Sequence, residues 1–167
     1  MATEDKYDRQ LRLWGPHGQK KLMECSMLLI GADGVGTETM KNLVLPGVGK
    51  FTILDGKTVS SDDLSNNFFV TPESVGRPRA EVVVETLCEM NEDVTGDFVV
   101  DNPKKLLLDD IKRVALLQQF QMVIVANQEQ AVVRAVAKTC WDVNIPLMVV
   151  RAYGMIGYMR SQVHCHE

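Results

Sequence analysis

The segment at residues 27–44 constrains the fold more than any other part of the chain. Four consecutive apolar residues, MLLI at 27–30, run directly into the glycine-rich turn GADGVG at 31–36. An uninterrupted apolar run predicts a strand that is buried on both faces, as in a parallel sheet. The residues after the turn show helical spacing of apolar positions up to Pro46-Gly47, where a helix must end. A strand, a tight turn and a helix therefore open an α/β fold.

Strands and amphipathic helices alternate through the rest of the chain. Further strands are predicted at 51–54, 98–100, 120–126 and 147–151, and helices at 76–91 and 129–143. The segment 102–119 should hold one or two short helices. The last segment, 154–163, alternates like an antiparallel strand, and two short helices at 4–14 and 17–24 come first. Repeated strand–helix–strand units predict a Rossmann-like three-layer α/β sandwich. Its sheet should be mostly parallel, with N-terminal helices and a C-terminal antiparallel strand.

Size and composition fit one globular domain over residues 1–167. The apolar fraction is 46%, the charged fraction is 24% and the mean hydropathy is −0.05, so the chain can bury a core. A net charge of −4 with scattered Lys and Arg pairs argues against nucleic acid as a partner. The apolar runs are far shorter than the roughly 20 residues of a membrane span, and no secretory leader is evident. We therefore expect no membrane partner and a location in the cytoplasm or the nucleus.

The four cysteines give no sign of a disulfide framework or a metal clip. Cys25, Cys88, Cys140 and Cys165 are widely spaced and form no C-x-x-C pair. In a chain without a leader, such cysteines are expected to be reduced thiols.

The glycine turn has the pattern of a phosphate-binding loop. Gly31, Gly34 and Gly36 lie between a strand and a helix, where backbone N–H groups and a helix N-terminus can face a phosphate. Asp55 ends the next strand, where dinucleotide and ATP folds place a carboxylate on the ribose. The alternative is that the glycines only permit a tight turn. Asp33 favours that alternative, because its carboxylate inside the loop would repel an incoming phosphate by several kcal/mol.

Six segments along the whole chain resemble the ubiquitin-activating-type enzymes, a ThiF/MoeB-like family. They are KYDRQLRLWG at 6–15, LIGADGVGTE at 29–38, KNLVLPGVG at 41–49, FTILD at 51–55, NNFF at 66–69 and RAYGMIGYM at 151–159. In this family an active subunit uses ATP and Mg²⁺ to adenylate the C-terminal glycine of a ubiquitin-like modifier, and a related inactive subunit completes the heterodimer. The resemblance is strongest to the regulatory subunits that serve a NEDD-type modifier.

Four departures from the active pattern identify the chain with the non-adenylating half. The phosphate-binding Arg is replaced within SNNFF at 65–69, and Arg79 stands where active members carry a Lys. The strand end VIVANQ at 123–128 lacks the Mg²⁺-binding Asp, and Asp33 enters the loop. The resemblance then implies that this chain binds no metal and no cofactor, and that ATP and Mg²⁺ belong to the partner's site. In this interpretation Gly31, Gly34, Gly36 and Asp55 are a vestigial cofactor-binding set.

Arg9 in the YxRQ motif is the one residue to which the resemblance assigns an active role. In the family this arginine reaches across the dimer to the ATP phosphates of the partner, and it would be the catalytic contribution of this chain in trans. The alternative is that Arg9 is an exposed charge on an amphipathic helix. The implied partners are a catalytic subunit and a NEDD-type modifier.

Two enzyme functions compete with that of a regulatory subunit. A self-sufficient ATP-dependent adenylyltransferase of the sulfur-carrier type would need the phosphate Arg and the Mg²⁺ Asp. An NAD-dependent oxidoreductase would need an acid/base set such as Tyr-x-x-x-Lys, which the sequence lacks. Family regulatory subunits are several times longer and carry a further helical domain after this region. We therefore expect 1–167 to be a single pseudo-adenylation domain, excised or naturally short, with an open sheet edge at 163–167.

Overall fold

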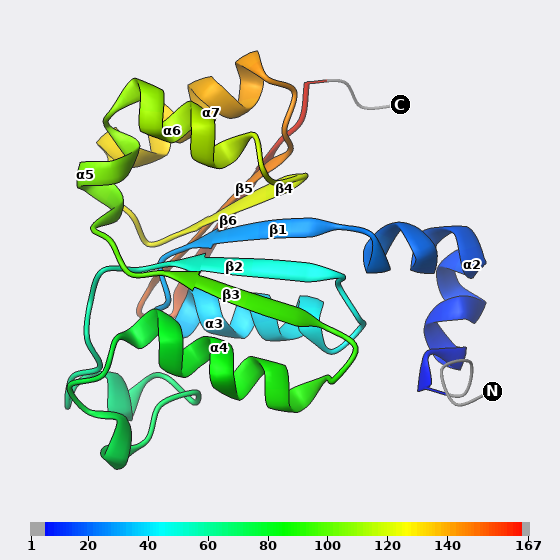
Figure 1. The fold of residues 1–167 in the computed structure, drawn as a ribbon, viewed down its shortest axis with the longest axis horizontal. Coiled ribbons are helices and arrows are strands. Elements are labelled where there is room, and N and C mark those ends of the chain that lie inside the picture. The colour runs from blue at the N-terminus through cyan, green and yellow to red at the C-terminus, as the bar shows by residue number, and fades with distance from the viewer. Residues whose placement is uncertain (1–5, 165–167) are drawn as a thin grey trace.

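The computed structural model describes residues 6–164, and its centre is a six-stranded sheet (Figure 1). The strands are β1 (Ser26–Ile30), β2 (Lys50–Leu54), β3 (Thr95–Val99), β4 (Met122–Ala126), β5 (Leu147–Tyr153) and β6 (Ile156–Gln162). They lie in the order β3-β2-β1-β4-β5-β6. The first five are parallel to their neighbours, and β6 is antiparallel to β5. The predicted Rossmann-like fold class is confirmed.

Helices cover both faces of the sheet (Figure 1). One face packs against α3 (Gly34–Val44) and α4 (Arg79–Met90), the other against α5 (Pro103–Leu107), α6 (Asp110–Leu117) and α7 (Gln130–Asp142). Alternate residues of β1 divide between the two cores: Met27 and Leu29 point to the first face, Leu28 and Ile30 to the second. Both faces of β1 are therefore buried, as its continuous apolar sequence predicted.

The two predicted N-terminal helices are confirmed as two helical segments, which share the label α2 (Asp8–Met23) and meet at Gly15. Gly15 has a non-helical backbone (φ 73°) inside it, directly before Pro16. Proline removes one helical hydrogen bond and crowds the preceding turn, so the kink falls where the sequence predicted a break. The first residues of the predicted helix at 4–14 lie outside the described residues.

The C-terminal hairpin turns at Gly154, whose φ of 59° suits a glycine. Met155, Tyr158 and Met159 of this hairpin are exposed in this chain, Met155 fully. Residues 165–167 of the predicted open edge lie outside the described part. Within that part, no helix is long and apolar enough to cross a membrane.

Candidate functional site

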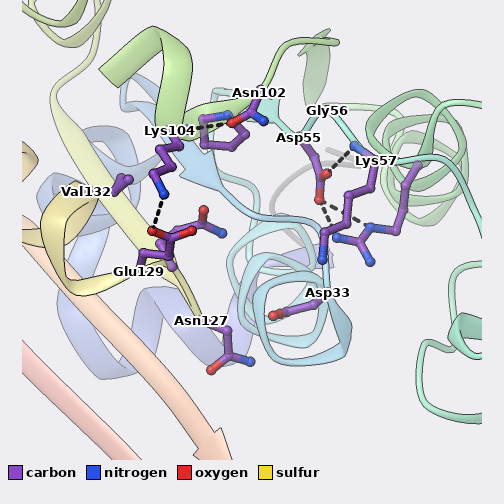
Figure 2. Close-up of a pocket in the computed structure, with 12 residues that line it drawn as sticks. Asp33, Asp55, Gly56, Lys57, Asn102, Lys104, Asn127, Glu129 and Val132 are labelled. Atoms are coloured by element: carbon purple, nitrogen blue, oxygen red, sulfur yellow. Dashed lines mark hydrogen bonds and ion pairs between the residues drawn. The ribbon is translucent and has the colours of Figure 1, made fainter. Parts of the chain in front are cut away.

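A pocket of about 300 Å³ opens at the carboxyl ends of β1, β2 and β4 (Figure 2). The strand order reverses between β1 and β4, and open α/β sheets bind ligands at such a switch point. The side chains that line it come from the glycine turn, the end of β2, the start of α4, the start of α5 and the end of β4. They include Asp33, Asp55, Lys57, Arg79, Lys104, Asn127 and Glu129.

Asp33 occupies the position at which this fold would hold a phosphate. It is the N-cap of α3, and its carboxylate accepts a hydrogen bond from the Gly36 N–H at 2.9 Å. The free N–H groups and the dipole of a helix N-terminus attract an anion, and here the chain supplies that anion itself. A bound phosphate would have to displace the Asp33 carboxylate or lie against it.

The three glycines of the turn are required by the packing of the chain itself. Gly31 has a φ of 100°, and a Cβ there would lie 2.6 Å from the Ala126 carbonyl oxygen. A Cβ on Gly34 would overlap the Asn66 carbonyl oxygen, and one on Gly36 would overlap the Gly31 carbonyl oxygen. A ligand-free role therefore accounts for each glycine.

Asp55 does not point freely into the pocket, because Arg79 holds it. The Arg79 Nη2 and Nε donate to Asp55 Oδ2 at 2.6 and 3.2 Å, and Nη1 donates to Asp63 Oδ1 at 2.7 Å. Asp55 also accepts from the N–H groups of Ala32 and Lys57. The three charged side chains are at most 10% exposed. The carboxylate that the sequence assigned to a ribose is thus part of a buried ion network.

The electrostatics of Asp63 follow from the same network. Burial alone raises the pKa of the Asp63 carboxyl, but two hydrogen bonds from Ser60 and the contact with Arg79 outweigh it and hold the pKa below its usual range. Conversely, burial lowers the pKa of Arg79 and the carboxylates of Asp55 and Asp63 raise it, with the balance upward. Asp63 and Arg79 are therefore both ionised at neutral pH.

The wall formed by the end of β4 offers little to a cation. Asn127, which follows β4, accepts a hydrogen bond from the Ala152 N–H at 3.1 Å. The nearby Glu129 carboxylate pairs with Lys104 at 2.8 Å (Figure 2). Among residues 6–164, no group of three or more His, Cys, Asp or Glu side chains could hold a metal ion.

The charges that line the pocket cancel. Asp33, Asp55 and Glu129 contribute three negative charges, and Lys57, Arg79 and Lys104 contribute three positive charges. Arg79 and Lys104 are already paired with carboxylates, which leaves Lys57 as the cation that lines the pocket without an ion pair among the described residues. A polyphosphate needs an excess of uncommitted donors, and this pocket does not provide it.

Arg9 lies at the other end of the molecule. The helix α2 leads into the amino end of β1, whereas the pocket lies beyond the carboxyl ends of the strands (Figure 1). Arg9 is exposed. The structure therefore does not bring Arg9 together with Gly31, Gly34, Gly36 and Asp55.

Tyr7 and Gln10, the neighbours of Arg9 in the YxRQ motif, attach the start of α2 to the rest of the domain. Tyr7 is buried, and its hydroxyl oxygen lies 3.0 Å from Asn91 Nδ2, which donates to it. The Gln10 amide donates to the Pro46 carbonyl oxygen at 2.9 Å. A Cβ on Gly47 would lie 2.7 Å from the Tyr7 hydroxyl oxygen. The YxRQ motif thus packs on the KNLVLPGVG segment, and these contacts fix the helix that carries Arg9.

Two residues of these arrangements gave no usable signal in the sequence. Asp63 lies in a polar stretch, and its role depends on Arg79, 16 residues later. Asn91 follows α4 and is buried against Tyr7, 84 residues earlier. The contacts Asp63–Arg79 and Asn91–Tyr7 are made by the tertiary fold, and no local sequence pattern predicts them.

Two of the thiols, those of Cys25 and Cys140, lie in environments that disfavour the thiolate form. Cys25, Cys88 and Cys140 are unpaired in the described part of the chain. Burial raises the pKa of the Cys140 thiol to about 12 and also raises that of Cys25. A thiolate nucleophile needs the opposite shift, so neither cysteine has the environment of a catalytic one.

Together these features define a class: a Rossmann-like domain of the nucleotide-binding type whose phosphate position is occupied by its own side chain. A model of the ThiF family matches residues 7–166. The chain belongs to the ThiF family, and the predicted resemblance is confirmed.

Curated relatives agree with this assignment, and a solved structure shares the fold. The chain is 50% identical to the NEDD8-activating enzyme E1 regulatory subunit of Xenopus laevis over 163 residues, which are 98% of this chain and 30% of that protein. It is 40% identical to the NEDD8-activating enzyme E1 regulatory subunit AXR1 of Arabidopsis thaliana, over 99% of this chain and 30% of that protein. A crystal structure of PaaA has the same fold, with a TM-score of 0.85 at 17% identity, over 98% of this chain and 55% of that chain. The chain spans about 30% of the length of the Xenopus laevis and Arabidopsis thaliana relatives.

Proposed function

We propose that this chain is the pseudo-adenylation domain of a regulatory subunit in a heterodimer that activates a NEDD-type ubiquitin-like modifier. It would support an active adenylating partner and would supply Arg9 to the ATP site of that partner. The chain itself would bind neither ATP nor Mg²⁺, and Gly31, Gly34, Gly36 and Asp55 would serve only the fold. The relatives at 40–50% identity support the class of complex.

The observation that carries the proposal is the separation of Arg9 from the pocket. Of the pocket's cations, Arg79 and Lys104 are paired with carboxylates and only Lys57 has no ion pair among the described residues, so the pocket offers few donors to a triphosphate. The exposed cation of the YxRQ motif is instead held at the opposite end, on a helix that buried Tyr7 fixes in place. An arginine that is fixed but unused within its own molecule is suited to stabilise phosphate charge in a partner.

A reconstituted complex tests the proposal. This chain is co-expressed with a catalytic-subunit candidate, and co-purification is followed by pyrophosphate exchange that depends on the modifier. Failure to co-purify with any catalytic subunit would contradict a regulatory role.

The Arg9→Ala variant is expected to slow adenylate formation by at least about tenfold while the heterodimer still assembles. The physical reason is that one charge-assisted donor is lost from the transferring phosphate. Arg12→Ala is the matched control, because Arg12 lies on the same helix, is exposed and pairs with Asp8 within α2. Equal rates for Arg9→Ala and the wild type would remove the role in trans.

The isolated chain is expected to bind MgATP with a dissociation constant weaker than about 1 mM, equivalent to about 4 kcal/mol of binding free energy. Isothermal titration calorimetry measures this directly. Asp33→Ala should stay as weak, because Arg79 remains engaged by Asp55 and Asp63. Micromolar affinity of the wild-type chain would instead favour a self-sufficient adenylyltransferase.

A further inference from the structure

The two helical segments of α2 form a first arm, 8–14, and a second arm, 16–23, which meet at Gly15. The first arm carries Arg9, and the second leads to β1 (Figure 1). Within α2, which lies wholly in the described part of the chain, Gln19 of the second arm is the one buried residue, at 4% exposure. Buried polar side chains are almost always hydrogen-bonded, so the partners of Gln19 show what its burial serves.

The side-chain amide of Gln19 links both arms to the turn after α3. Its Oε1 accepts hydrogen bonds from Trp14 Nε1 at 3.0 Å and from Gln10 Nε2 at 3.2 Å, both on the first arm. Its Nε2 donates to the Pro46 carbonyl oxygen at 2.9 Å, and Gln10 Nε2 donates to the same oxygen at 2.9 Å. We call these four groups, the side chains of Gln10, Trp14 and Gln19 and the Pro46 carbonyl, the Gln19 cluster.

Two glycines allow the arms to meet in this way. Gly15 has a φ of 73°, a conformation that other residues rarely adopt, and it forms the bend. A Cβ on Gly18 would lie 2.8 Å from Trp14 Cδ1 and 3.1 Å from Trp14 Cβ, so the Trp14 side chain lies directly against the backbone of the second arm. The angle between the arms is therefore set by close packing as well as by the hydrogen bonds of Gln19.

The first arm has few other attachments to the domain. None of its residues, all of which the structure describes, is buried, so little apolar packing holds it in place. Its start is held by Tyr7, whose hydroxyl oxygen accepts a hydrogen bond from Asn91, and its later part is held by the Gln19 cluster. Arg9 lies between these two anchors, and its own side chain is exposed. The two anchors therefore determine where the Arg9 guanidinium lies relative to the domain.

We infer that Gln19 is a positioning residue for the contact that Arg9 makes in trans. Gln19 is buried and acts only by fixing the first arm relative to the rest of the domain. The inference rests on the proposed function, because it names what places Arg9 in the partner's site. Electrostatic stabilisation depends on where a charge is held, and a misplacement of about 1 Å can slow a reaction about 100-fold.

A double-mutant cycle on the reconstituted heterodimer tests the inference. Gln19→Leu keeps the approximate volume of the side chain and removes all three of its hydrogen bonds. We expect kcat for modifier-dependent pyrophosphate exchange, per mole of assembled heterodimer at saturating MgATP, to fall at least about fivefold. In the Arg9→Ala background the same substitution should change the rate by less than about twofold, because the group that Gln19 positions is already absent.

A merely structural role of Gln19 would give a different result. Loss of active heterodimer through poor folding lowers the rate by the same factor in both backgrounds, because folding does not depend on Arg9. Thr139→Val is the matched control, since Thr139 is also 4% exposed and its hydroxyl oxygen accepts a hydrogen bond from Arg113 Nε, but it lies on α7. Thr139→Val should lower the unfolding midpoint and leave the rate per heterodimer equal to that of the wild type.

Trp14→Phe is a milder variant for the case in which the Gln19→Leu chain does not assemble. It keeps an aromatic ring, removes the N–H that Trp14 donates to Gln19, and should slow the exchange about two- to about fivefold, but not in the Arg9→Ala background. Two results overturn this inference alone: equal factors of loss in both backgrounds, or a slow Arg9→Ala variant beside Gln19→Leu and Trp14→Phe variants that match the wild type. Equal rates for Arg9→Ala and the wild type overturn the role in trans, and this inference with it.

Discussion

Replacing Arg79 by methionine is expected to lower the free energy of unfolding by about 3–5 kcal/mol. Methionine fills a similar volume, but Asp55 and Asp63 would lose the guanidinium that contacts both at 2.6–2.7 Å. Two carboxylates that are at most 10% exposed would then be left without a cation beside them. Urea unfolding at pH 7, followed by circular dichroism, measures the loss.

Arg79→Lys is the matched control for charge without the planar fork. Lysine can contact one carboxylate at a time, so an intermediate loss is expected. If methionine and lysine at position 79 were both as stable as the wild type, the ion network would not be a structural element, and Asp55 would be free to serve a ligand.

The stability of the Arg79→Met variant should depend on pH differently from that of the wild type. The lowered pKa of Asp63 means that its ionised form contributes stability above the usual carboxyl pKa of about 3.9, and that this contribution is lost as the pH falls through the lowered value. In Arg79→Met, acid protonates the unpaired carboxylates and removes their penalty. The stability gap between wild type and variant should therefore be widest near neutral pH and should narrow below about pH 4. A gap that does not change with pH would show that lost packing, and not charge, causes the effect.

The sequence predicted the sheet and its helices well, because the buried positions of a strand or helix recur in the sequence at a regular spacing. The unbroken MLLI run identified β1, and the regular spacing of Ala80, Val83, Val84 and Leu87 identified α4. It also identified β6 as antiparallel, although nothing local indicated that Tyr158 would remain exposed. Whether an apolar residue at a sheet edge is covered depends on what lies beside it.

The sequence predicted where the candidate site lies, but it did not predict which side chains pair with one another there. The glycine turn and Asp55 marked the carboxyl edge of the sheet correctly. Arg79 was interpreted as a replacement for a phosphate-binding lysine, but the structure shows that its guanidinium is bound by two carboxylates of the chain. That outcome depends on the 3₁₀ turn at Asp63–Ser65, which places Asp63 beside α4. Such long-range pairings are set by the folded chain as a whole.

The Gly36→Ala variant is expected to destabilise the domain by about 3 kcal/mol without any nucleotide present, at the upper end of the usual range for overpacking. The added methyl would overlap the Gly31 carbonyl oxygen and lie 3.0 Å from the Ala126 Cβ. Because the first contact is with backbone on the other side of the turn, no side-chain rotation can relieve it. The unfolding midpoint should fall by about 6–12 °C in a chain of this size.

Gly157→Ala provides the control, because a Cβ at Gly157 would meet no atom within 4 Å. That position is exposed in β6, and alanine there should change stability by less than about 0.5 kcal/mol. The pair of variants separates two accounts of the glycine turn. If the glycines were kept for a phosphate, Gly36→Ala would fold as stably as Gly157→Ala and would differ only in nucleotide binding. If the turn is a packing element, as the contacts of Gly31, Gly34 and Gly36 indicate, the loss appears in the unliganded domain. The glycine pattern that suggested a phosphate site is then maintained by the close approach of β1, α3 and β4.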